Sequence, residues 1–88
     1  MSKSQRDKGQ REERKIAALL GATKISAMHK PGADLVMPDG RSVEVKVRAG
    51  GFKRIYQWIE PVDILVIRAD REEPLIVIRL DDYMKGTQ

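Results

Sequence analysis

Asp34, Glu44 and Lys46 are two carboxylates and a lysine that could act together on a substrate. Carboxylate oxygens are the ligands that Mg²⁺ prefers, and a bound Mg²⁺ polarises a phosphate group. A lysine beside them stabilises negative charge or orients an attacking water. Two neighbouring carboxylates repel each other unless a cation lies between them. The trio, if brought together, predicts a site for metal-assisted hydrolysis.

A β-hairpin is the element that would bring the three residues together. Two apolar-rich runs, residues 33–37 and 42–47, flank Pro38-Asp39-Gly40. These three residues suit a loop in which proline opens a type I turn and glycine takes the left-handed conformation. If Met37 lies opposite Arg41, the two carboxylates lie opposite each other, and strand alternation places the lysine on the same face.

A second interpretation of the hairpin stays open. Valine alternating with charge, as around Glu44 and Lys46, is also typical of the solvent face of a half-exposed strand. That interpretation is favoured for these two residues alone. Asp34 at the matching register is what favours a site.

A helix over residues 7–20, ended by Gly21, is predicted before the hairpin. Its apolar stripe, when projected back towards the start of the helix, reaches Glu13 and Glu12. A carboxylate on this face either pairs with an arginine or lysine or joins the hairpin carboxylates. The stripe consists of Ile16, Leu19 and Leu20.

The hairpin motif resembles the signature of the PD-(D/E)XK nuclease superfamily, an Asp and an Asp/Glu-x-Lys on adjacent strands. The matching segments are Gly32-Ala33-Asp34-Leu35-Val36 and Val43-Glu44-Val45-Lys46, with Ala33 where the signature has proline. The segment Lys8-Gly9-Gln10-Arg11-Glu12-Glu13-Arg14 is similar to the Lys-Gly-x-x-x-Glu-Arg opening of archaeal-type Holliday junction resolvases. Their active-site glutamate corresponds to Glu13, with Glu12 as the alternative.

The resemblance implies a Mg²⁺-dependent DNA endonuclease of recombination and repair, with Mn²⁺ as a substitute, that acts on branched DNA as a homodimer. Its metal would be held by Asp34, Glu44 and Glu13, and its catalytic residues would be these three and Lys46. A flap or end nuclease of the replication-repair type stays open, and Gln57 in the following helix supports it. A nucleic-acid-binding module that keeps the fold but does not cut is the third possibility.

The charge balance favours a polyanionic partner, because 17 lysines and arginines face 13 acidic residues and the sequence pI is about 9.6. Lys53 and Arg54 are expected on the outer face of a helix just after the hairpin. The resolvases carry a Ser-containing basic loop before the catalytic Asp, and Ser26, His29 and Lys30 occupy comparable positions here. His29 could shuttle protons or contact phosphate, but a solvent-exposed loop histidine without function is favoured. The predicted DNA-binding residues are Lys8, Arg11, Lys30, Arg48, Lys53 and Arg54.

The remaining pattern predicts an α/β (α+β) protein with a restriction-endonuclease-like αβββαβ core, a mixed sheet flanked by helices. Residues 1–88 are expected to form one domain, with 1–8 flexible. The helix after the hairpin is predicted to bury Tyr56 with its apolar stripe. Trp58 lies at the border of this stripe and is either a core residue at its rim, which is favoured, or an anchor of a dimer. The further elements are strands at 23–27, 62–69 and 75–80, the last two buried on both faces, and helices at 52–60 and 81–85, the latter capped by Asp81.

Composition excludes some classes of site. The sequence has no cysteine, so a disulfide framework or a thiolate metal site is excluded. We find no run of 18 apolar residues and no signal peptide, and therefore expect a soluble cytoplasmic protein. The 88 residues bury only a modest core, so a dimer would add stability.

Overall fold

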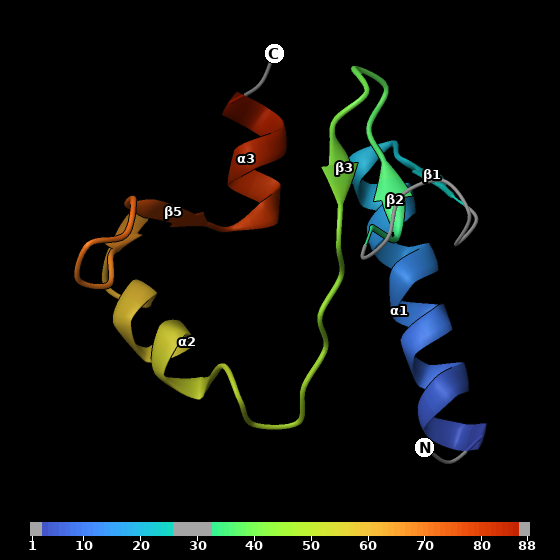
Figure 1. Cartoon of the computed structure of the whole chain (residues 1–88), viewed down its shortest axis with the longest axis horizontal. Helices are drawn as coiled ribbons and strands as arrows, with labels where there is room; N and C mark the ends of the chain where they lie inside the picture. The colour runs from blue at the N-terminus through green and yellow to red at the C-terminus, as the bar shows by residue number, and fades with distance from the viewer. Residues whose placement is uncertain (1–2, 26–32, 87–88) are drawn as a thin grey trace. The chain divides into compact units, whose positions relative to one another are not determined.

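A computed structural model describes residues 3–25 and 33–86 and shows a mixed α+β protein (Figure 1). The chain divides into two compact units, Met1–Val47 and Arg48–Gln88, each described by itself below. The predicted order of helix, three strands, helix, two strands and short helix is confirmed. The elements are α1 (Lys3–Leu20), β1 (Thr23–Lys24), β2 (Leu35–Val36), β3 (Ser42–Val43), α2 (Lys53–Ile59), β4 (Ile64–Ile67), β5 (Leu75–Ile78) and α3 (Leu80–Gly86).

Helix α1 ends where the sequence predicts, at Gly21. This glycine has a φ of +69°, and its N–H donates to the Ala18 carbonyl at 3.4 Å while the Ala22 N–H donates to Ala17 at 2.9 Å. The two bonds form a Schellman motif, which satisfies the last carbonyls of the helix. The helix begins at Lys3, earlier than predicted.

The first unit contains an antiparallel sheet in the order β1-β2-β3. Strand β2 pairs with β3 in the predicted register, with Leu35 opposite Val43 and Val36 opposite Ser42. The predicted turn is also confirmed, because Gly40 has a φ of +94° and its N–H donates to the Met37 carbonyl at 2.9 Å. All three strands are shorter than predicted.

The core of the first unit centres on Leu35, which is fully buried. Leu20 at the end of α1 is also buried, and Ile16 is half-buried one turn earlier. Leu19 was expected on the same stripe but is 54% exposed. Helix α1 packs against β1, and Ile16 and Leu20 of the predicted stripe are covered while Leu19 is not.

In the second unit, α2 packs against β4. Ile59 is buried, and Phe52 and Ile55 are half-buried on the same face. Tyr56 is 71% exposed and Trp58 is 52% exposed, so both were wrongly predicted to be buried. A helix of seven residues offers one narrow contact face, and these two side chains lie beside it.

Strands β4 and β5 form a separate two-stranded antiparallel sheet. The ladder pairs four residues with four, from Ile64 opposite Ile78 to Ile67 opposite Leu75. Alternation places Ile64, Val66 and Ile76 on one face. All three are more than half exposed, so the prediction of strands buried on both faces is not met.

Arg79 follows β5, and its side chain forms hydrogen bonds to the end of α2 and the residues after it. Its guanidinium donates to the carbonyls of Val62 at 2.9 Å, Ile59 at 3.0 Å and Glu60 at 3.3 Å. Ile59 and Glu60 lie at the C-terminal end of α2, where carbonyls lack partners within the helix, and Val62 follows the helix. Arg79 also directly precedes α3, and its carbonyl accepts the Tyr83 N–H of the first turn at 2.9 Å. Asp81 was predicted to cap this helix but lies inside its first turn.

The described strands form two antiparallel sheets, whereas the sequence predicted one mixed sheet. Their shortness accounts for part of this difference, because a strand of two residues offers few backbone groups for a further partner. In the part of the chain that the structure describes, no helix is long and apolar enough to cross a membrane.

Candidate active site

Asp34 is the residue around which the candidate site is built, because it forms three hydrogen bonds to two other segments of the first unit. Its N–H donates to the Val43 carbonyl at 2.8 Å, and its carbonyl accepts the Ile25 N–H at 3.2 Å. Its carboxylate oxygen Oδ2 accepts the Val45 N–H at 2.7 Å. Asp34 therefore links the β1 side of the sheet to the chain leaving β3.

The bonds of Asp34 are offset by one residue from the β2–β3 ladder. The register of the ladder would continue with Asp34 opposite Glu44, yet the Asp34 N–H bonds to Val43 instead. Such an offset is typical of a β-bulge, which disrupts the ladder locally. It explains why β3 ends at Val43 although the sequence predicts a strand to residue 47. The predicted register is therefore confirmed only as far as the ladder runs.

Glu44 and Lys46 form an ion pair beyond the end of β3. The Lys46 Nζ lies 2.9 Å from the Glu44 Oε1, and both side chains are about half exposed, at 54% and 47%. Side chains two residues apart on an extended chain point the same way, as predicted. The structure thus brings these two residues together, although an exposed pair of this kind stabilises the fold little.

The carboxylate predicted from α1 has a basic partner. Glu13 Oε2 lies 3.6 Å from the Nζ of Lys24 on β1, and the Glu13 side chain is 22% exposed. Glu12 instead pairs with Lys15 along the helix, with Nζ and Oε1 3.3 Å apart. Glu13 is therefore the more covered of the two glutamates, and its observed partner matches the first alternative weighed from the sequence, pairing with a lysine.

The three predicted carboxylates could hold one metal ion only if their side chains lay close together. No group of three acidic or histidine side chains within residues 3–25 and 33–86 lies close enough to hold one. Asp34 bonds to a backbone N–H, Glu44 pairs with Lys46, and Glu13 pairs with Lys24. The described arrangement does not fit a cation site made of all three carboxylates.

The predicted DNA-binding residues are spread over both units. Arg11 is exposed on α1, and Arg48, Lys53 and Arg54 are exposed in the second unit. Lys8 belongs to α1, but its side chain is outside what the structure describes. Lys30 also lies outside the described residues, as do Ser26 and His29. The outward position predicted for Lys53, Arg54 and Gln57 on α2 is confirmed.

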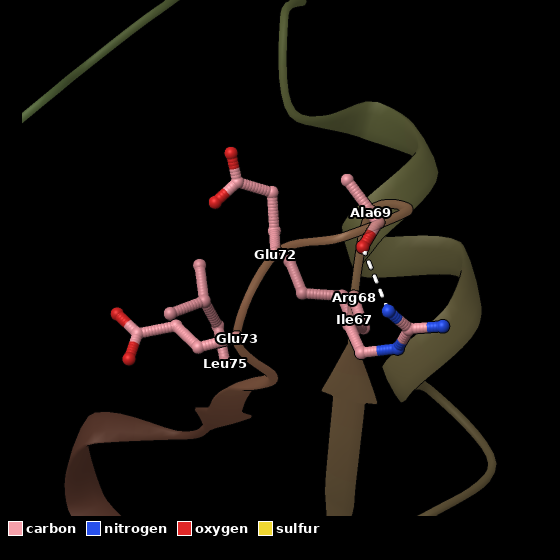
Figure 2. Close-up of a pocket in the computed structure, with 6 residues that line it drawn as sticks. All are labelled: Ile67, Arg68, Ala69, Glu72, Glu73 and Leu75. Atoms are coloured by element: carbon pink, nitrogen blue, oxygen red, sulfur yellow. Dashed lines mark hydrogen bonds between the residues drawn. The ribbon is translucent and has the colours of Figure 1, made fainter.

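A pocket of about 440 Å³ lies at the turn between β4 and β5. Figure 2 shows the carboxylates of Glu72 and Glu73 on one side and Arg68 on the other, with its guanidinium bonded to the Ala69 carbonyl at 3.1 Å. The pocket contains none of the residues predicted to act. No pattern in the sequence predicts this pocket, since charged residues in a turn are ordinary. Ile67 and Leu75 complete the lining.

Asp39 in the hairpin turn is a structural carboxylate that sequence analysis did not single out. Its Oδ1 accepts the Arg41 N–H at 3.1 Å, and its Oδ2 accepts the Arg41 Nε–H at 2.8 Å. The backbone bond from Arg41, followed by the guanidinium bond and charge, lowers the pKa of Asp39 from its ordinary value. Aspartate often bonds in this way to a backbone N–H two residues on, which is the signal available from sequence.

Comparison of the chain with protein families, curated proteins and solved structures gives no match.

Proposed function

We propose that this chain is a DNA endonuclease that hydrolyses phosphodiester bonds in branched DNA, with Mg²⁺ as its cofactor and Mn²⁺ as a substitute. One observation supports the proposal above the others. The carboxylate of Asp34 bonds directly to the chain segment that carries Glu44 and Lys46, so the three residues of the sequence motif lie on neighbouring segments of the first unit.

The chain's own residues have distinct roles in this proposal. Lys46 is a half-exposed cation that would stabilise negative charge building up on a phosphate. The sequence motif assigns Asp34, Glu44 and Glu13 to the cation, an assignment that the described arrangement does not fit. Lys53 and Arg54 on α2, with Arg48 before it, would contact the phosphate backbone, as would Arg11 on α1.

Asp34, Glu44 and Glu13 would hold a cation together only if each of them left its present partner. Here each of the three carboxylates has a different partner. Cleavage assays with and without a divalent cation therefore decide whether one is required. The roles of Lys46 and of the basic residues do not depend on how a cation is bound.

A restriction-endonuclease-like core and a homodimer belong to the same proposal. The observed element order begins with the αβββαβ order of that core. A homodimer would place two sites on the two strands of a junction and would add buried surface to a chain of 88 residues.

A second candidate is a nucleic-acid-binding module that does not cut. The observation that favours it is the same separate pairing of the three carboxylates, which reduces their repulsion towards a phosphate backbone. The two candidates agree on DNA as the partner and differ only in cleavage.

Cleavage assays on several DNA geometries separate the candidates. Purified protein would be incubated with a four-way junction, a flap, a linear duplex and a single strand, in Mg²⁺, in Mn²⁺ and with chelator. We expect cleavage of the junction that requires the divalent cation. Preference for the flap would favour the replication-repair type of nuclease. Tight binding of the junction without a nick in either metal would contradict the endonuclease and leave the binding module.

Variants of basic residues separate cutting from binding. We expect Lys46→Ala to lower the single-turnover cleavage rate by about 100-fold or more, the scale for losing one electrostatic stabiliser. Junction affinity, measured by gel shift in Ca²⁺, should change little, because one lysine is one phosphate contact among many. Lys15→Ala is the control, since Lys15 is also an exposed lysine paired with a glutamate, and it should leave the rate unchanged.

The double variant Lys53→Ala, Arg54→Ala should have the opposite effect. Removing two exposed cations from α2 should weaken junction binding and reduce the slope of its salt dependence by about two. Cleavage at saturating protein should be nearly unchanged. Equal losses of binding in this variant and in Lys46→Ala would argue that Lys46 is only another phosphate contact.

A further inference from the structure

We propose that Asp34 is also a positioning residue, whose carboxylate fixes the segment carrying Glu44 and Lys46 by accepting the Val45 N–H. The proposal assigns Asp34 a role that does not require it to touch a metal or a phosphate. Its relevance to cleavage rests on the proposed function, whereas the contact itself can be tested without any substrate.

The geometry of the contact carries the proposal. The Val45 N–H lies 2.7 Å from the Asp34 Oδ2, at a partly buried position. A bond of this length to a charged acceptor is of the stronger, charge-assisted kind. A covered backbone N–H without a hydrogen-bond acceptor makes the folded state less stable. The carboxylate thus supplies the acceptor that the interrupted ladder does not.

The position of Val45 explains what the contact achieves. Val45 lies between Glu44 and Lys46, and residues 44–48 have no assigned strand structure. Fixing the central N–H restricts the backbone on both sides of it. The ion pair of Glu44 with Lys46 is therefore formed on a segment whose position is set from β2.

Asp34 itself is well held, as a positioning residue must be. Its N–H donates to Val43 and its carbonyl accepts from Ile25, and its neighbour Leu35 is fully buried. The side chain therefore projects from the most firmly packed strand of the first unit. A rigid support of this kind is what places a reacting group to within a fraction of an ångström.

Two substitutions separate the acceptor from the charge. Asp34→Asn keeps a carbonyl oxygen that can accept the Val45 N–H but removes the negative charge, whereas Asp34→Ala removes both. Asp39→Ala is the matched control, because Asp39 also accepts a backbone N–H in the same hairpin, that of Arg41. It should leave Val45 unaffected.

Amide hydrogen exchange and backbone order measured by NMR test the proposal. In Asp34→Ala we expect the Val45 amide to exchange about 10- to 100-fold faster than in the wild type, as for loss of a hydrogen bond to a charged group, and the order of the Glu44 and Lys46 amides to fall. In Asp34→Asn the exchange should stay within about tenfold of the wild type. Equal acceleration in both variants would overturn the proposal, as would no acceleration in Asp34→Ala.

A direct measurement keeps the test valid if Asp34→Ala does not fold. A scalar coupling across the hydrogen bond, from the Val45 nitrogen to the Asp34 carboxyl carbon, is expected in the wild type and is not expected to change in Asp39→Ala. Absence of this coupling in the folded wild type would overturn the proposal. If the coupling and the exchange pattern are found but the wild type cuts no DNA, the positioning role stands and the proposed endonuclease fails.

Discussion

The two hairpins of this chain are built in different ways. The β2–β3 hairpin has a ladder of only two residue pairs, and a carboxylate bonds to its backbone at each end, Asp39 at the turn and Asp34 at the open end. The β4–β5 hairpin has four pairs, all of them between Ile, Leu and Val. The first is held together largely by specific polar contacts, and the second by cross-strand aliphatic pairs.

The two hairpins differ in where they carry charge. All eight paired residues of the aliphatic hairpin are Ile, Leu or Val, so its ladder carries no charged side chain. In the polar hairpin the ladder stops early, and the chain that continues from it carries Glu44 and Lys46 as half-exposed side chains. An interrupted ladder thus provides positions for charged groups beside a firmly packed strand.

The largest effect on stability is expected from Leu35→Ala, because Leu35 is fully buried. Truncating a buried leucine removes apolar burial and leaves a cavity, and costs about 2–5 kcal/mol. Leu75→Ala in the aliphatic hairpin is the matched control, since Leu75 is 55% exposed, and it should cost about 1 kcal/mol or less. Urea unfolding followed by circular dichroism measures both. Equal losses would show that the two hairpins do not differ as described.

A smaller effect is expected from Arg79→Met in the second unit. The guanidinium of Arg79 bonds to three backbone carbonyls between 2.9 and 3.3 Å, so its loss removes three bonds from a charged donor at a cost of about 1–3 kcal/mol. Arg68→Met is the control, because Arg68 makes one exposed bond, to Ala69. Thermal unfolding compares the two variants, and a larger loss in Arg68→Met would contradict the role given to Arg79.

The smallest effect is expected from the titration of Asp39. Its pKa is lowered from the ordinary value of 3.8, chiefly by the Arg41 N–H. A lowered pKa means that the carboxylate stabilises the fold above 3.8, and this contribution is lost as the pH falls through the pKa of the folded state. Asp39→Asn should flatten the decline of the melting temperature between about pH 5 and pH 2. An unchanged slope would mean that the Arg41 bonds do not form in solution.

Local signals in the sequence predicted the first hairpin and the end of α1 well. Pro38 and Gly40 fix a turn whose geometry sets the register, and Gly21 takes a conformation that few other residues adopt. These features depend on a few adjacent residues. They were therefore predictable without knowledge of the rest of the fold.

Features that depend on packing were predicted less well. Periodicity placed Leu19 and Tyr56 in apolar stripes, but both are exposed, because a stripe indicates which side chains can be buried and not which ones meet a partner. The bond from the Val45 N–H to Asp34 could not be predicted, since it follows from a one-residue offset at the end of the ladder. Within the candidate site, the order of residues was predictable, and their individual partners were not.

The pairing of strands that are neighbours along the chain has a consequence for how each unit forms. In the described part, β1 pairs with β2, β2 with β3, and β4 with β5. Each pairing closes a short loop, and the entropy lost on closing a loop grows with its length. Chains dominated by such local pairings have a low contact order, and a low contact order accompanies fast folding. Each unit can therefore form its sheet early, with little conformational search.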